Sequence, residues 1–115
     1  ELLRLWEQDP AAWLLPWAVL PEIDHLARRI LGPQVARLFL QDVAAGAFAV
    51  EDLQPADVRN AVELDLRHAG LRAGLVDCVV AAIAARIGVT AIATLDERDF
   101  AVLAPSTPLY PRDLT

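Results

Sequence analysis

One of the most apolar stretches of the chain contains an acid and runs Gly74-Leu-Val-Asp-Cys-Val-Val-Ala-Ala-Ile-Ala-Ala-Arg-Ile-Gly88. Apolar residues continue for three to four turns without Pro, and Gly88 supplies a stop, so the pattern predicts a helix. A second apolar run, residues 91–95, predicts a short buried strand that ends directly at Asp96. In open α/β sheets, ligands bind at the carboxyl ends of the strands, which makes Asp96 a candidate site residue.

The rest of the chain alternates between segments with helical and with strand patterns of apolar residues. We expect a helical remnant at 1–8 and a buried strand at 13–17, in which Pro16 favours an edge or strand-end position. Further on, we expect helices at 19–31 and 33–45, a strand at 48–53, a helix at 55–68, a loop at 69–74 and a short strand near 109–110. In the helix at 33–45, Val35, Leu38, Phe39 and Val43 give an apolar face. Alternating strands and helices predict an α/β fold with a parallel or mixed sheet, and the length predicts a single domain over 1–115.

Composition narrows the class of protein. The hydrophobic fraction of 56% is enough for a core, and no apolar run reaches the length of a membrane span, so we expect no membrane partner. The net charge of −6 argues against a broad basic surface that binds nucleic acid by charge alone. A single cysteine, Cys78, excludes an internal disulfide, fits a cytoplasmic location and is expected to be a small core residue.

Four acids are candidate site residues, and each also has an ordinary structural explanation. Glu22 and Asp77 lie near predicted helix starts, where a carboxylate complements the helix dipole. Asp96 and Asp99 can be turn or capping residues, with residues 97–99 forming a solvated turn. Asp24 points away from Glu22 on the same helix, so we expect it in solvent.

Taken together, these acids occupy the helix starts and strand ends that converge at one edge of an α/β sheet. Clustered carboxylates repel one another unless a cation lies between them. Hard divalent ions prefer oxygen ligands, and Mg²⁺ takes one or two carboxylates together with water and substrate phosphate. On the Asp77 face, the small residues Ala81 and Ala84 leave room for an ion or another element.

The two apolar segments resemble the C-terminal half of PIN domains, and more narrowly VapC-type toxins of type II toxin–antitoxin modules. The segment Val19-Leu-Pro-Glu-Ile-Asp-His-Leu-Ala-Arg-Arg29 is similar to the first conserved helix of the same family. The resemblance covers essentially the whole chain in the right order. It implies a PIN-like three-layer α/β/α sandwich with a mainly parallel sheet and an Mg²⁺- or Mn²⁺-dependent endoribonuclease that acts on structured RNA such as tRNA.

Carried over residue by residue, the resemblance makes Glu22, Asp77 and Asp96 the catalytic acids. It adds Asp99 as a further, more variable metal ligand and Thr94 as a hydroxyl partner of the acid that follows it. The family also has an Asp at the end of an N-terminal strand, and no residue here matches it. We therefore expect the chain to be N-terminally truncated and to lack the first strand and the first helix.

The resemblance also implies partners: an RNA substrate, a cognate antitoxin and a second copy in a homodimer. The apolar residues Leu2, Leu3, Leu5 and Trp6 are a candidate docking surface for an antitoxin segment, and a core-facing stripe explains them equally well. Arg28, Arg29 and Arg37 are candidate phosphate contacts, although a solvated helix face is the better explanation for them. His25 and His68 are expected to be solvated or structural. Two alternatives stay open, a non-catalytic PIN-like protein-binding module and an unrelated α/β scaffold whose acids are caps.

Overall fold

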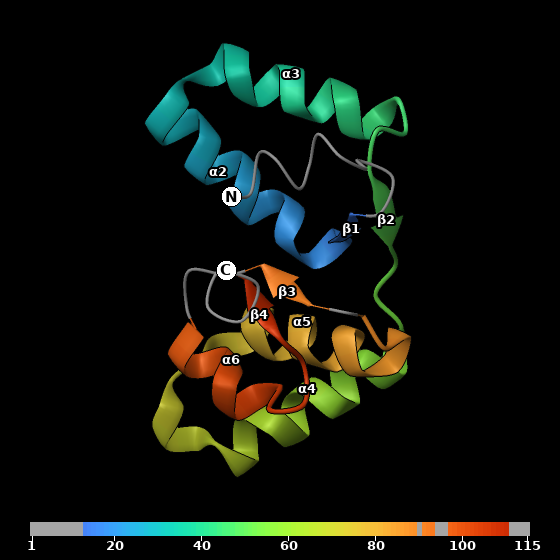
Figure 1. Ribbon diagram of the computed structural model, residues 1–115. Coiled ribbons are helices and arrows are strands. Elements are labelled where there is room, and N and C mark those ends of the chain that lie inside the picture. Colours follow the sequence, from blue (N-terminus) through green and yellow to red (C-terminus); the bar gives the residue numbers. More distant parts are fainter. Residues whose placement is uncertain (1–12, 90, 94–96, 111–115) are drawn as a thin grey trace. The chain divides into compact units, whose positions relative to one another are not determined.

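A computed structural model of the chain describes residues 13–89, 91–93 and 97–110 (Figure 1). The chain divides into two units, Leu2–Asp52 and Leu53–Thr115, and each is described by itself. Within the described residues, each unit pairs two short parallel strands with helices. The predicted remnant at residues 1–8, with its candidate docking surface, lies outside the described residues.

From residue 13 on, where the structure describes it, the N-terminal unit holds two strands and two long helices. Its elements are β1 (Leu14–Pro16), the 3-10 helix η2 (Trp17–Val19), α2 (Leu20–Leu31), α3 (Pro33–Ala44) and β2 (Ala49–Glu51). β1 and β2 pair in parallel, with Leu15 opposite Val50. α2 packs against α3. The two predicted helices and the second predicted strand are therefore confirmed, with the strand shorter than expected.

Proline and glycine set the boundaries of these helices. Pro21 occupies the first turn of α2, where its missing N–H costs nothing. Gly32 ends α2 with φ of 95°, a left-handed conformation that favours glycine, and Pro33 begins α3 at once. The sequence signals at 21 and 32–33 were correct because they depend on local backbone chemistry alone.

Two details of the N-terminal unit differ from prediction. β1 is half-buried and stops at Pro16, and Trp17 is 51% exposed in η2. The stop at Pro16 itself agrees with the expected strand end, since a proline lacks the N–H that would extend strand pairing. In α3, Leu38 of the expected apolar face is 61% exposed and Ala36 is the buried residue, while Phe39 packs edge-on against Phe48 at 5.3 Å between ring centroids.

The C-terminal unit is built around two helices that contact each other along their length. Its elements are α4 (Pro55–Arg67), the 3-10 helix η3 (Ala69–Leu71), α5 (Gly74–Ile87), β3 (Ile92–Ala93), α6 (Glu97–Leu103) and β4 (Leu109–Tyr110). α5 packs against α4 and also contacts α6, which in turn contacts β4. β3 and β4 pair in parallel, and the Ile92 N–H donates to the Pro108 carbonyl at 2.9 Å.

α5 is the core of this unit. Six of its residues are buried: Cys78, Val79, Ala81, Ala82, Ile83 and Ala84. The predicted core role of Cys78 is confirmed, since its side chain is fully buried. Gly88 ends the helix in a left-handed conformation, φ 74° and ψ 45°, and its N–H donates to the Ala84 carbonyl at 2.9 Å. Figure 1 shows that the chain then reverses and β3 runs back toward the end where α5 begins.

One helix was not predicted. Residues 97–99, expected as a solvated turn, begin α6, which buries Phe100 and Leu103 in the core together with Leu109 of β4. The segment 69–74 contains η3 and the start of α5, so it is not simply a loop. Among the residues that the structure describes, no helix is long and apolar enough to cross a membrane.

Candidate active site

The structure places Asp77 in the first turn of α5, half-buried next to the fully buried Cys78. A carboxylate there lies where the positive end of the helix dipole stabilises negative charge. Burial raises the pKa of the Cys78 thiol, and the charges of Asp65 and Asp77 raise it further. The thiol is therefore held protonated and does not serve as a nucleophile at neutral pH.

Asp99 lies in the first turn of α6 and is half-buried. α6 contacts α5, and Figure 1 shows α6 starting near the end of the unit toward which β3 runs. The start of α5, the end of β3 and the start of α6 thus occupy one end of the C-terminal unit. This end is the one at which strand-terminal acids gather in α/β proteins.

The other predicted site residues are placed differently. Thr94 and Asp96 lie outside the described residues. Glu22 is exposed in the first turn of α2, and so belongs to the other unit. Among residues 13–89, 91–93 and 97–110, no three His, Cys, Asp or Glu side chains form a group suited to a metal ion. Within the described chain, therefore, Asp77 and Asp99 are the two predicted acids that share a unit.

The donor chemistry of the predicted set fits a hard divalent cation. Asp77, Asp99, Asp96 and Glu22 offer carboxylate oxygens only, the ligand type that Mg²⁺ and Mn²⁺ prefer. Asp77 and Asp99 are both half-buried in the first turns of helices, so their carboxylates are held on rigid backbone. Soft ligands are not available at this end, because the single thiol is fully buried.

The small residues along α5 line a cavity further along the helix. Its volume is about 400 Å³, and it lies against Ala81, Ala84, Ala85, Gly88, Val89, Leu103, Ala104, Pro105, Ser106 and Thr107. Ala81 and Ala84 were predicted to let another element approach Asp77. In the structure they border this cavity and are themselves almost fully buried, so their small size serves packing around α6.

The fully buried acid of the chain's described part is Asp57, which the sequence analysis did not single out. It is the third residue of α4 and accepts the Gln54 backbone N–H at 2.9 Å, as in a capping box. Arg86, in the last turn of α5, donates to both Asp57 carboxylate oxygens at 2.8 and 3.0 Å. These hydrogen bonds from Arg86 hold the pKa of Asp57 below its ordinary value of 3.8, although burial opposes the shift.

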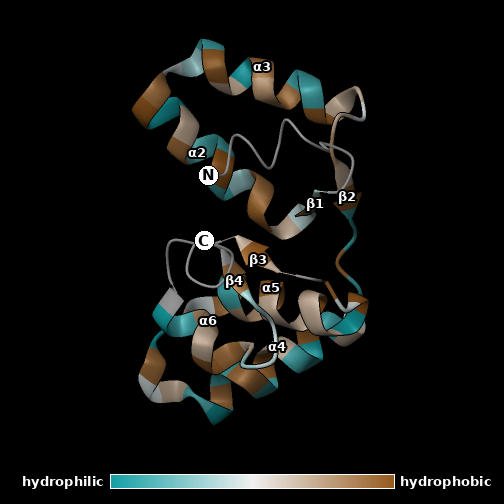
Figure 2. Cartoon of the chain, in the orientation of Figure 1, coloured by the Kyte–Doolittle hydropathy of each residue, from teal (hydrophilic) through white to brown (hydrophobic). Residues whose placement is uncertain are grey.

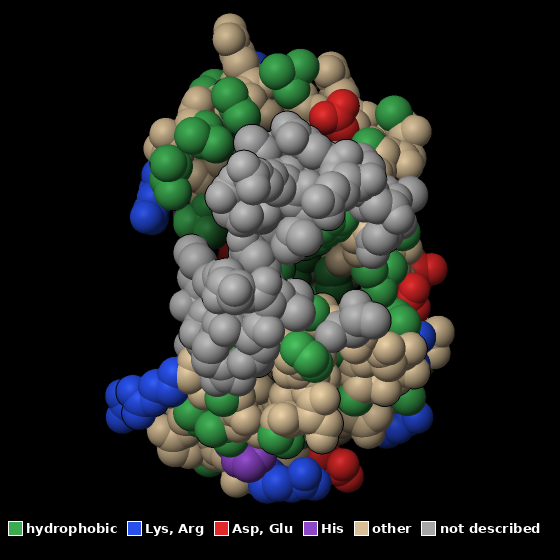
Figure 3. Space-filling model, in the orientation of Figure 1, with side chains coloured by type: hydrophobic (Ala, Val, Ile, Leu, Met, Phe, Trp, Pro, Cys, Tyr) green, Lys and Arg blue, Asp and Glu red, His purple; other side chains and the backbone are tan. Residues whose placement is uncertain are grey.

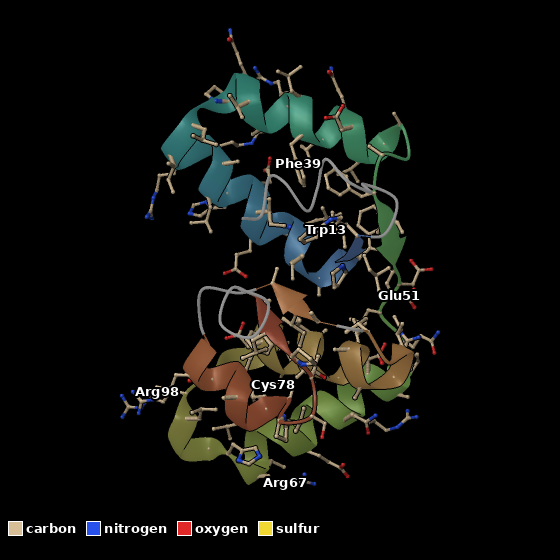
Figure 4. The ribbon with its side chains drawn as sticks, viewed as in Figure 1. Trp13, Phe39, Glu51, Arg67, Cys78 and Arg98 are labelled. Atoms are coloured by element: carbon tan, nitrogen blue, oxygen red, sulfur yellow. The ribbon has the colours of Figure 1, made fainter. Side chains whose placement is uncertain are left out.

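Of the arginines considered for phosphate binding, one forms an ion pair and the others are exposed. Arg28 donates to both oxygens of Asp24 at 2.9 and 3.0 Å within α2, so Asp24 is not simply solvated. Arg29 and Arg37 are exposed. Arg98 is exposed in the first turn of α6, next to Asp99, and Figure 4 shows it projecting outward. On the face drawn in Figure 3, the described charged side chains are scattered and form no broad basic patch.

The two histidines lie outside helices α5 and α6, which carry Asp77 and Asp99. His25 is exposed in α2, and His68 is half-buried after α4. Both positions agree with solvated or structural roles.

Comparisons of the sequence and of the fold with known proteins point to the same family. The PIN domain model matches residues 1–104. Ribonuclease VapC26 of Mycobacterium tuberculosis (strain ATCC 25618 / H37Rv) is 28% identical over 87 residues, which are 76% of this chain and 64% of that protein. The chain therefore spans less than two thirds of the length of this relative.

A solved structure is similar to the fold. The crystal structure of Mycobacterium tuberculosis VapC20, described as a Sarcin-Ricin loop cleaving toxin, aligns with a TM-score of 0.67 and 24% identity. The alignment covers 76% of this chain and 68% of VapC20. The likeness supports the predicted PIN-like α/β sandwich.

Proposed function

Because the chain belongs to the PIN domain family, we propose that the protein is a divalent-metal-dependent endoribonuclease of the VapC toxin type. The observation that carries the proposal is the family match over 1–104 combined with half-buried Asp77 and Asp99 at one end of the C-terminal unit. The similarity to a ribonuclease supports the RNA-cleaving activity. The match runs through both units, which also supports a single domain over 1–115.

The proposed ligands of Mg²⁺ or Mn²⁺ are Asp77, Asp96, Glu22 and Asp99, with Thr94 orienting the acid that follows it. When bound, the metal would supply an activated water and stabilise charge on the leaving oxygen of a phosphodiester. The carboxylate oxygens themselves can accept hydrogen bonds from water, which would place solvent next to the scissile phosphate.

Arg98 extends this proposal to substrate binding. It is exposed next to Asp99, so its guanidinium is free to meet RNA phosphate beside the acids without neutralising a buried group. A local cation of this kind suits a chain of net charge −6, which lacks a general attraction for RNA. Arg29 and Arg37 are further candidate phosphate contacts from the other unit.

The remaining partners follow the same proposal. We expect an RNA substrate such as tRNA, a cognate antitoxin that covers the acids, a homodimer and a cytoplasmic location. Structured RNA and a protein inhibitor compete for one site in this scheme, so antitoxin binding should block cleavage.

The test is a calorimetric Mn²⁺ titration beside an RNA cleavage assay. Asp77→Asn and Asp96→Asn should each abolish cleavage and weaken Mn²⁺ binding at least 10-fold, while circular dichroism shows retained folding. Asp42→Asn, an exposed acid of α3, is the matched control and should change neither result. If the protein binds an antitoxin but neither binds Mn²⁺ nor cleaves RNA, the nuclease proposal is wrong and the protein is a protein-binding PIN module.

Arg98→Ala separates substrate binding from metal binding. The expected result is a several-fold rise in KM with kcat and Mn²⁺ affinity unchanged, because the side chain contacts phosphate and not the ion. Arg67→Ala is the control, since Arg67 is exposed in the last turn of α4. An equal effect of both substitutions would mean that only net charge matters.

A further inference from the structure

The aromatic side chains that the structure describes in the N-terminal unit differ in their exposure. Trp17 is 51% exposed, whereas Trp13 is half-buried. Phe39 and Phe48 pack edge-on against each other. A tryptophan stabilises a protein by burying its ring, and tryptophans are enriched among the residues that dominate the binding energy of interfaces. The exposed ring of Trp17 is therefore a candidate contact for a ligand.

The backbone on both sides holds Trp17 in place. Pro16, which ends β1, is extended with φ of −66°, and the proline ring fixes this angle. On the other side, the Leu20 backbone N–H donates to the Trp17 carbonyl, and the Leu20 side chain is buried. A tryptophan side chain has only two rotatable bonds, so a fixed backbone presents its ring at a low cost in conformational entropy. Trp17 is thus suited to be a rigid contact.

Trp17 lies at the edge of the strand pair where a ligand is expected. It follows the carboxyl end of β1, and the parallel register sets Pro16 opposite Glu51, the last residue of β2. Ligands of α/β sheets bind at such carboxyl ends. Glu22, a proposed metal ligand, is exposed in the first turn of α2, five residues after Trp17. The ring and this acid therefore belong to one short segment of one unit.

We propose that Trp17 stacks against an unpaired base of the RNA substrate, and so makes the protein favour single-stranded loops over duplex. The inference rests on the proposed nuclease function for the identity of the ligand. In a duplex, neighbouring base pairs cover both faces of a base, whereas an unpaired base can stack on an aromatic side chain. Stacking needs no positive charge, so it suits a chain of net charge −6. Trp17 takes no part in the chemical step and determines which RNA reaches the acids.

The surroundings of Trp17 favour a single planar ring over a broad apolar partner. Among residues 13–20, Trp17 is the one exposed side chain, and the next two exposed residues are Pro21 and Glu22. Beyond them, Figure 2 shows hydrophobic and hydrophilic residues alternating along α2. A docking helix needs several adjacent apolar contacts, whereas one base needs one ring and tolerates a polar border. A base is therefore the occupant that fits this position.

Fluorescence anisotropy of a labelled RNA hairpin tests the proposal, in the Asp77→Asn chain with Mg²⁺ present so that bound RNA is not cut. The hairpin should bind more tightly than a loop-free duplex of the same stem. Trp17→Ala should weaken hairpin binding about 5- to 100-fold, the range of base–aromatic stacking, and leave duplex binding unchanged. Equal hairpin affinities with and without Trp17→Ala, or no hairpin binding at all, would overturn the proposal and leave Trp17 to a protein partner.

Two further substitutions separate stacking from a structural role. Trp17→Leu keeps apolar bulk without a planar ring, so it should lose as much affinity as Trp17→Ala. Trp17→Phe keeps an aromatic ring and should stay within a few-fold of the parent. Leu38→Ala, in the same unit and 61% exposed, is the matched control and should have no effect. Circular dichroism verifies that each variant folds. Full affinity in Trp17→Leu would contradict stacking, because any apolar contact would then be sufficient.

Removal of single loop bases identifies the stacked nucleotide. An abasic nucleotide at that position should weaken binding as much as Trp17→Ala, and both changes together should cost no more than either alone, because they remove one contact. Additive losses at every loop position would contradict a direct contact.

Cleavage of the same hairpin by the chain with Asp77 intact keeps the two proposals distinguishable. Binding that depends on Trp17, without cleavage, would remove the nuclease proposal alone. Cleavage together with hairpin binding that does not depend on Trp17 would remove the stacking proposal alone.

Discussion

Helices α4 and α5 each place an aspartate in the first turn, yet the two carboxylates have different surroundings. Asp57 of α4 is fully buried and receives hydrogen bonds from Gln54 and Arg86. Asp77 of α5 is half-buried, although α5 is by far the more apolar helix. Burial of an acid therefore depends on which face of the helix it occupies and on whether a cationic side chain can pair with it inside the protein. It does not depend on how apolar its neighbours in sequence are.

The two aspartates therefore have different roles. Asp57 joins the start of α4 to the end of α5, two positions brought together by the antiparallel packing of neighbouring helices. Asp77 keeps access to solvent, which a group that binds an ion or a substrate needs. Substitutions at Arg86, Asp57 and Asp77 test this division, and the largest change in the free energy of unfolding is expected at Arg86.

Arg86→Met should destabilise the protein by about 2–3 kcal/mol, because it leaves the buried Asp57 carboxylate with the Gln54 N–H and no cation. The cost is below that of a deeply buried pair, since Arg86 is 26% exposed and water reaches its end of the contact. Urea unfolding monitored by circular dichroism measures the change. A loss no larger than that of Arg67→Met, on the exposed end of α4, would show that the pair contributes little.

Asp57→Asn should cost less, about 1–2 kcal/mol, because the amide oxygen still accepts from Gln54 and the released Arg86 can reach water. Combining it with Arg86→Met should cost less than the sum of the two single changes, as the members of one hydrogen-bonded pair are coupled. Additive losses in the same urea experiment would contradict a direct interaction.

Acid should remove the contribution of Asp57. Its pKa in the folded protein is lowered from 3.8, so the stabilisation is fully present above that value and is lost as the pH falls through the lower folded value. The stability difference between the parent and Asp57→Asn should thus be constant above about pH 5 and shrink below about pH 4. A difference that is independent of pH in this window would mean that the carboxylate charge is not involved.

Asp77→Asn should change stability by no more than about 1 kcal/mol, the range of substitutions outside the core. It should also lower the pKa of the Cys78 thiol slightly, because one of the nearby negative charges that raise it is removed. Ultraviolet absorbance of the thiolate during a pH titration measures the shift. A loss of stability as large as that of Arg86→Met would make Asp77 a structural acid and weaken the case for a site.

Much of the fold was predictable where the signal was local. The boundaries of α2 and α3 follow from Pro21, Gly32 and Pro33, and the end of α5 follows from Gly88. α6 was missed because its first turn is wholly charged or polar, and its helical form depends on Phe100 and Leu103 packing into a core made by distant residues. Pattern alone does not report such tertiary contacts.

The candidate site stays a prediction, and the structure reports only where two of its acids lie. Asp77 and Asp99 were chosen from the pattern of acids at helix starts and strand ends, and the family resemblance then supported the choice; both lie in the first turns of helices in one unit. The Asp57–Arg86 contact was missed, although the segment Gln54-Pro-Ala-Asp57 has the sequence signals of a helix N-terminus. Its partner lies 29 residues away, at the far end of another helix, and no local signal connects them.

The reversal after α5 rests on the handedness of one residue. Gly88 adopts φ of 74°, in the left-handed region that glycine tolerates and L-residues avoid. An L-alanine there would meet no neighbouring atom within 4 Å, and would still be strained by its own backbone by about 1–2 kcal/mol. A D-alanine prefers the same conformation, so chemical synthesis with a mirror-image residue at this position would stiffen the unfolded chain and leave the turn between α5 and β3 as it is.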